Sequence, residues 1–118
     1  MNFLKSIFNI KEEPIKSYSD FWKWFEKNEN IFHKVVKSQG DIEDVFFNKL
    51  GPKLNELKEG FWYLTGMYDD NNSELILTAD GIIKNIVFVE ELVDSAPKFK
   101  NWIITALKQP TDLNHNME

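Results

Sequence analysis

The few side chains able to do nucleophilic or acid–base chemistry stand far apart in this sequence. The only histidines are His33 and His115, and there is no cysteine. A thiol nucleophile, a disulfide and a thiolate metal site are therefore excluded. His33 falls in a predicted helix and could act as a base for Ser38 or another hydroxyl, but surface or half-buried helical histidines are far commoner than catalytic ones. We therefore predict no catalytic residue.

Oxygen-bearing residues at 69–80 have a spacing similar to that of a calcium loop. Asp69, Asn71 and Ser73 alternate, and Asp80 closes the segment. The sixth position is Glu74, where such a loop needs glycine for its sharp turn. We therefore expect a polar hairpin tip and predict no metal and no cofactor. The rival hypothesis is a divalent-metal enzyme with a carboxylate site made by Asp69, Asp70, Glu74 and Asp80.

Aromatic side chains are better candidates for binding, because the chain has 10 Phe, 4 Trp and 3 Tyr. Trp22 and Trp24 are two positions apart in a predicted helix and cannot point along one stripe, so one of them should lie at the rim of the core. Large rings on both sides of the elements also fit a two-sided core. Exposed tryptophan and acidic residues suit protein recognition. The predicted partner-binding residues are Trp22, Trp24, Trp62, Asp69 and Asp70.

The charge balance bears on the kind of partner. Asp and Glu number 19 against 14 Lys, there is no Arg, and the formal net charge is -5. Nucleic-acid binding needs a local cationic surplus, so we predict no nucleic-acid partner. No apolar run approaches the roughly 20 residues of a bilayer span, so we predict no membrane span. The absence of cysteine and of a secretory signal pattern favours a cytoplasmic location.

One domain is the expected organisation, because 118 residues with 42% hydrophobic content suffice for a single core. Residues 1–16 read as an N-terminal helix and linker, with Phe3, Leu4, Ile7, Phe8 and Ile10 on a helical stripe. Residues 17–110 form the predicted globular core. Residues 111–118 have little to bury and are expected to be a flexible tail.

Hydrophobic residues recur at three- and four-residue steps over 17–40, which predicts a helix. Ser17 and Asp20 have the spacing of a helix-capping pair. Asn28 and Asn30 interrupt the pattern, so two shorter helices are the alternative.

A second helix is predicted over 41–60, where Gly60 supplies the stop. Pro52 lies inside its pattern and has no N–H to donate to the carbonyl of Asn48. We therefore expect a kink or a break there.

After residue 60 the hydrophobic pattern changes to the two-residue alternation that is typical of β-strands. Residues 61–68 and 74–79 predict a β-hairpin across four turn-forming residues, followed by a helix over 85–96 and a strand over 102–107. The fold class is therefore α+β, with the order α-α-β-β-α-β and a small three-stranded mixed sheet packed by helices. Because 61–68 is aromatic on both faces, we expect it at the centre, in the strand order 2-1-3. Two sheet edges remain that some neighbour must protect.

Four blocks of the chain resemble a family of uncharacterised bacterial proteins of unknown function. They are SDFWKWF at 19–25, ELILTADG at 74–81, VEELVDSAP at 89–97 and NWIITALKQP at 101–110. The resemblance implies a shared fold and no catalytic residues. Some members look longer, which implies that further strands, or another chain, complete the sheet edge.

These observations lead to three hypotheses of function. The first is a non-enzymatic protein–protein interaction module that binds through an acidic, aromatic-rimmed surface or a sheet edge, an immunity-type inhibitor being one form. The second is the carboxylate-based enzyme described above. The third is a self-associating accessory domain, with a homodimer as its working state.

Overall fold

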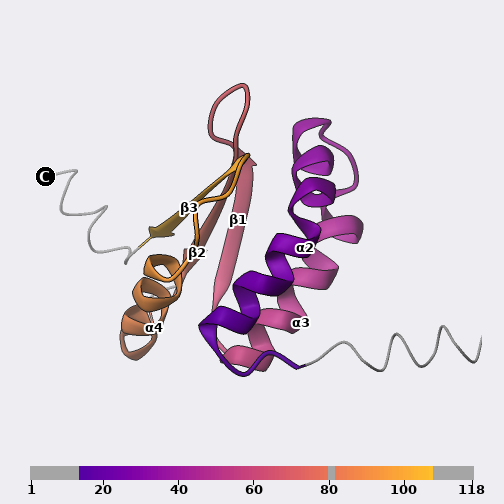
Figure 1. The fold of residues 1–118 in the computed structure, drawn as a ribbon. Coiled ribbons are helices and arrows are strands. Elements are labelled where there is room, and N and C mark those ends of the chain that lie inside the picture. The colour runs from indigo at the N-terminus through magenta and orange to yellow at the C-terminus, as the bar shows by residue number, and fades with distance from the viewer. Residues whose placement is uncertain (1–13, 80–81, 108–118) are drawn as a thin grey trace, which may run out of the picture.

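The computed structural model describes residues 14–79 and 82–107, which form an α+β fold with a mixed three-stranded sheet (Figure 1). The predicted stripe at 1–10, the tail at 111–118 and Asp80 lie outside these residues. In chain order the elements are α2 (Tyr18–Lys37), the π-helix η1 (Glu43–Phe47), α3 (Asn48–Leu57), β1 (Trp62–Met67), β2 (Ser73–Thr78), α4 (Ile83–Asp94) and β3 (Trp102–Leu107).

The helix α2 is one continuous element of 20 residues, not two shorter ones. It begins after Ser17, whose hydroxyl oxygen accepts a hydrogen bond from the Asp20 N–H at 3.1 Å. Asn28 does not interrupt the helix, since its side-chain amide donates to the Trp24 carbonyl one turn earlier. Such a bond satisfies the polar side chain within the helix and removes its competition with the backbone.

The expected break at Pro52 is absent, because α3 continues through it. The irregular turn lies upstream, where η1 has π-helical pairing and the Asn48 N–H bonds to the carbonyl of Glu43. A proline in a helix removes one N–H donor. Pro52 is exposed at the surface, and the missing bond does not end the helix.

The central strand is β2, so the predicted order 2-1-3 is wrong. β2 pairs antiparallel with β1 and parallel with β3, giving the order β1-β2-β3. The central position belongs to the best-shielded strand, and Leu75 and Leu77 of β2 are fully buried. β1 does carry apolar side chains on both faces, but it lies at the edge and one of its faces is exposed.

Only one face of the sheet joins the core. Leu75, Leu77 and Trp102 lie on this face, and the pairing places Tyr63, Ile104 and Ala106 beside them. Val89 and Leu92 of α4 and the rings of α2 belong to the same buried cluster. The described helices therefore cover this core face. The opposite side, here named the outer face, carries Trp62, Leu64, Ile76, Ile103 and Leu107.

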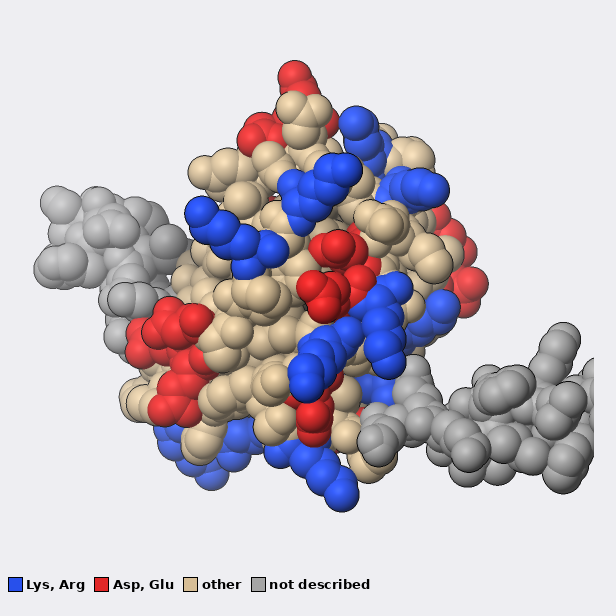
Figure 2. Space-filling view, in the orientation of Figure 1, with Lys and Arg blue, Asp and Glu red and all other residues tan. Residues whose placement is uncertain are grey.

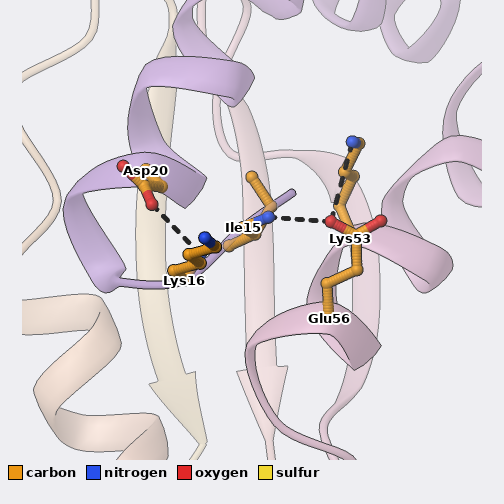
Figure 3. Close-up of polar contacts among 5 residues, drawn as sticks. All are labelled: Ile15, Lys16, Asp20, Lys53 and Glu56. Carbon is orange, nitrogen blue, oxygen red and sulfur yellow. Dashed lines mark hydrogen bonds and ion pairs between the residues drawn. The ribbon is translucent and has the colours of Figure 1, made fainter. Parts of the chain in front are cut away.

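The segment before α2 is tied to α3 at one end of the helical layer (Figure 3). The buried Ile15 donates its N–H to Glu56 Oε1 at 2.8 Å, and the same oxygen lies 3.8 Å from Lys53 Nζ. The Lys16 N–H donates to Asp20 Oδ2 at 3.0 Å. These contacts set the direction from which the chain enters α2.

Candidate protein-binding surface

The largest exposed apolar side chains of the sheet gather on the β1–β2 hairpin. Trp62 is 56% exposed, Leu64 54%, Met67 38% and Tyr68 59%. These four residues are here named the β1 surface. Tryptophan and tyrosine at an exposed, clustered position are the residue types that contribute most to protein–protein binding.

Among the described residues only β2 pairs with β1, so the main chain of β1 offers hydrogen-bonding groups along its other edge, here named the free edge. In an antiparallel strand the N–H and C=O groups of successive residues point to opposite sides. The Tyr68 N–H donates to the Asn72 carbonyl at 2.7 Å, so the even-numbered residues of β1 direct these groups toward β2. Tyr63, Thr65 and Met67 therefore direct theirs away from β2, toward the free edge.

Nothing in the sequence of β1 protects this edge. The strand reads WYLTGM, with no charged residue and no proline, whereas exposed edge strands commonly carry lysine, proline or a bulge that prevents further pairing. All six of its residues pair in unbroken register with β2. A Cβ placed on Gly66 would meet no atom within 4 Å, so the outer face is open at this position.

The hairpin tip adds negative charge beside the β1 surface. Acidic side chains lie at the tip of the hairpin at the top of Figure 2, where the turn carries Asp69 and Asp70. Asp69 Oδ1 accepts hydrogen bonds from the N–H groups of Asn71 and Asn72, each at 2.8 Å. The Asn71 N–H and the Asn72 side chain lower the pKa of Asp69. Asp69 therefore keeps its charge at neutral pH while it shapes the turn.

Two predicted binding residues lie inside the core. Trp22 is 3% exposed and Trp24 is 7% exposed, so the expectation that one of them lies at the rim is wrong. The physical reason is that α2 is buried over a broad face. Trp22 packs on Phe99 and donates its indole N–H to the Leu92 carbonyl at 2.9 Å, while Trp24 packs on Phe32. Of the predicted residues, Trp62, Asp69 and Asp70 are exposed and belong to one hairpin, with Trp62 at the start of β1 and the two aspartates at the tip.

Two acidic residues of the rival metal hypothesis make hydrogen bonds within the fold. Asp69 is held by its own turn, and Glu74 Oε2 accepts a hydrogen bond from Thr105 Oγ1 at 2.6 Å. Within 14–79 and 82–107, no three His, Asp or Glu side chains form a cluster that could hold a metal ion. Asp80, the fourth residue of that hypothesis, lies outside these ranges.

One close contact between reactive side chains was not anticipated from the sequence. His33 Nδ1 lies 2.7 Å from Ser73 Oγ, and the Ser73 hydroxyl also lies 3.6 Å from the Met67 sulfur. Burial and the charge of Lys37 lower the pKa of His33. Ser73 is fully buried, so its hydroxyl is not accessible to a substrate. The contact therefore joins α2 to the start of β2 and is not a nucleophile–base pair.

An open pocket of about 350 Å³ lies between the start of α2, the end of α3 and α4. Leu57, Phe61 and Phe88 line it, and Lys58 Nζ lies 4.4 Å from the centre of the Phe88 ring. Tyr18 also lines the pocket; its burial and its hydrogen bond to Glu91 raise its pKa to about 12. The tyrosine therefore stays neutral near pH 7, and these rings and lysines do not form an acid–base pair.

No family model, no curated protein and no solved structure matches the chain. Among the helices in the described ranges, none is long and apolar enough to cross a membrane.

Proposed function

We propose that this chain is a non-enzymatic protein-interaction module that binds another protein through the β1 surface and the acidic hairpin tip. The observation that carries the proposal is the exposure of Trp62 and Leu64 on the outer face of an uncharged edge strand, with Tyr68 exposed just beyond it and Met67 exposed on the other face of β1. Monomeric proteins seldom expose a contiguous apolar patch unless it serves an interaction.

Two kinds of interaction can act together at this site. The outward N–H and C=O groups of Tyr63, Thr65 and Met67 can extend the sheet by pairing with a strand of the partner, which gives affinity through the main chain. The exposed rings of Trp62 and Tyr68 can then fill pockets on that partner.

Where the partner is a different protein, the acidic tip favours one with a basic patch near its binding strand. Charge complementarity of this kind speeds association and disfavours wrong partners. A small acidic inhibitor of a basic protein, such as an immunity-type inhibitor of a bacterial toxin, is the specific form that the charge of -5 and the exposed edge support. The lack of cysteine suits a role in the cytoplasm.

Affinity capture from a native lysate tests the proposal. The test variant combines Trp62→Ser, Leu64→Ser and Tyr68→Ser, which removes most of the β1 surface. The matched control combines Ile83→Ser and Val87→Ser, because both of these α4 side chains are exposed and apolar but lie away from β1.

We expect the wild-type chain and the α4 control to retain the same stoichiometric protein, and the β1 variant to lose it. Circular dichroism should show all three chains folded, since the replaced side chains are exposed. Equal capture by the β1 variant, or failure of the wild type to bind any stoichiometric protein, a second copy of this chain included, would contradict the proposal.

A further inference from the structure

We infer that the protein which β1 fits is a second copy of this chain, paired antiparallel to β1 across a twofold axis that passes beside Thr65. This inference rests on the proposed function, because it names the partner of the β1 surface. The pair would join two three-stranded sheets into one continuous sheet of two copies.

The main chain determines which residues can lie on the axis. Only Tyr63, Thr65 and Met67 direct their N–H and C=O groups toward the free edge, as the Tyr68 to Asn72 hydrogen bond requires. In a symmetric antiparallel pair these residues must oppose one another. The register that pairs the whole strand and also includes Tyr68 places Thr65 opposite the Thr65 of the second copy, and Tyr63 opposite Met67.

This register also matches the side chains. On the outer face Trp62 would lie opposite the Tyr68 of the second copy, and each of these rings is more than half exposed in the single chain. Leu64 would lie opposite Gly66, where no atom lies within 4 Å of the position of a Cβ. Aromatic pairs directly opposite each other stabilise antiparallel strands. When two copies of β1 run antiparallel with Thr65 on the axis, the side chains of each strand therefore match those of the other.

The absence of charged side chains on β1 and the apolar area that this strand exposes both permit contact with a second copy. The chain has a net charge of -5, but β1 itself has no charged side chain, so the pairing brings no like charges together along the strand. A specific interface needs roughly 1,000 Å² in total, or about 500 Å² from each copy. Two aromatic side chains of about 150–250 Å² each, both more than half exposed, supply a large part of that area. Leu64, Met67 and the edge of the main chain add to it.

β3, at the other edge of the sheet, is a poorer candidate. It also lacks charge, but its side chains from Trp102 to Leu107 are buried or half-buried, and none is among the exposed large hydrophobic residues. A second copy at β3 would therefore gain little apolar area beyond the main-chain hydrogen bonds.

Single-cysteine cross-linking tests the axis directly, because the natural chain has no cysteine. Hydrogen-bonded residues opposite each other in an antiparallel pair have Cα atoms about 5.5 Å apart, which is within the range of a disulfide. We expect Thr65→Cys to form a covalent dimer under mild oxidation. Lys23→Cys, at an exposed position of α2, should stay monomeric. Failure of Thr65→Cys to cross-link, or preferential cross-linking of Leu64→Cys, would overturn this register.

Sedimentation velocity with two variants at one position tests the pairing without a cross-link. Thr65→Val and Thr65→Pro both lose the hydroxyl that donates to the Glu74 carbonyl, but only proline loses the outward N–H. Proline is tolerated on an edge strand where its nitrogen faces solvent. We expect the wild type and Thr65→Val to be dimers and Thr65→Pro to be a folded monomer. If Thr65→Pro does not fold, Gly66→Lys replaces it, since its side chain enters open space in the single chain and places a charge in the dimer contact.

The outcomes separate this inference from the proposed function. A monomeric wild type that still captures a different protein through the β1 surface would overturn the second-copy inference and leave the proposed function standing. A wild-type dimer that survives both Thr65→Pro and Gly66→Lys would place the contact elsewhere and overturn the inference. A monomer that captures no protein would overturn both.

Discussion

His33 and Ser73 show how a contact between reactive side chains can be structural. The serine is fully buried at the start of β2, and the histidine holds it from α2 at 2.7 Å. The sequence shows a histidine in a helix and a serine in a turn region, 40 positions apart, and no spacing rule connects them. Their contact depends on how α2 packs on the sheet, which a local pattern does not contain.

The lowered pKa of His33 predicts how stability depends on pH. The folded chain binds fewer protons than the unfolded chain when the pH lies between the lowered pKa and the ordinary value of 6.5. The free energy of unfolding attributable to His33 is therefore fully present above 6.5 and decreases as the pH falls below it. His33→Asn keeps a polar group near Ser73 and removes the titration.

Urea unfolding of the wild type and His33→Asn, from about pH 7.5 to about pH 5.5, checks this prediction. We expect the wild type to lose stability relative to the variant as the pH falls. A difference between the two proteins that stays constant over this range would show that His33 does not titrate with a lowered pKa.

Asp69 supports a second prediction at the residue scale. Its carboxylate oxygen already accepts two main-chain N–H groups of the turn, and the described ranges hold no cluster of three metal-binding side chains. We expect the thermal midpoint to stay unchanged as calcium, magnesium or manganese is added. Binding to the folded state alone would raise the midpoint with metal concentration, and such a rise would support the carboxylate hypothesis instead.

At the scale of elements, local signals predicted much of what the structure shows. The capping pair at Ser17 and the hairpin between β1 and β2 both appear, whereas α3 ends at Leu57, three residues before the predicted stop at Gly60. The predicted break at Pro52 does not, because one missing hydrogen bond at an exposed position costs less than the packing of α3 contributes. Backbone signals predict where an element begins more reliably than whether a single unfavourable residue ends it.

Gly60 is an element boundary that a substitution can test. Its φ of 99° lies in the region that side chains disfavour, and a Cβ there would lie 2.3 Å from the Asn85 side-chain nitrogen. We expect Gly60→Ala to lower the free energy of unfolding by about 1–3 kcal/mol. Gly66→Ala is the matched control, because its Cβ would enter open space, and it should change stability by less than about 1 kcal/mol.

Urea denaturation of both glycine variants compares them under the same conditions. Equal stability of Gly60→Ala and Gly66→Ala would contradict the strained turn between α3 and β1. A larger loss for Gly60→Ala confirms that the turn requires glycine.

At the scale of the whole molecule, the sequence predicted the class and the number of strands but not their order. The ring-rich strand was expected at the centre because aromatic residues usually bury their surface. The structure instead buries Leu75 and Leu77 of β2 and leaves Trp62 and Leu64 of β1 more than half exposed. Strand order depends on which strand has its inward side chains fully buried beneath the helices. The same long-range packing buried Trp22 and Trp24 and left Trp62 of the hairpin exposed.

Amide hydrogen exchange at the edge of β1 tests most directly whether this strand is the binding edge. In the isolated chain at low concentration, the outward amides of Tyr63, Thr65 and Met67 should exchange rapidly, whereas that of Leu64, which faces β2, should be protected. Occupation of the edge by the captured partner, or by a second copy at high concentration, should slow the three outward amides and leave α4 unchanged. Outward amides that exchange at the same rate in the free and the bound state would contradict binding through β1.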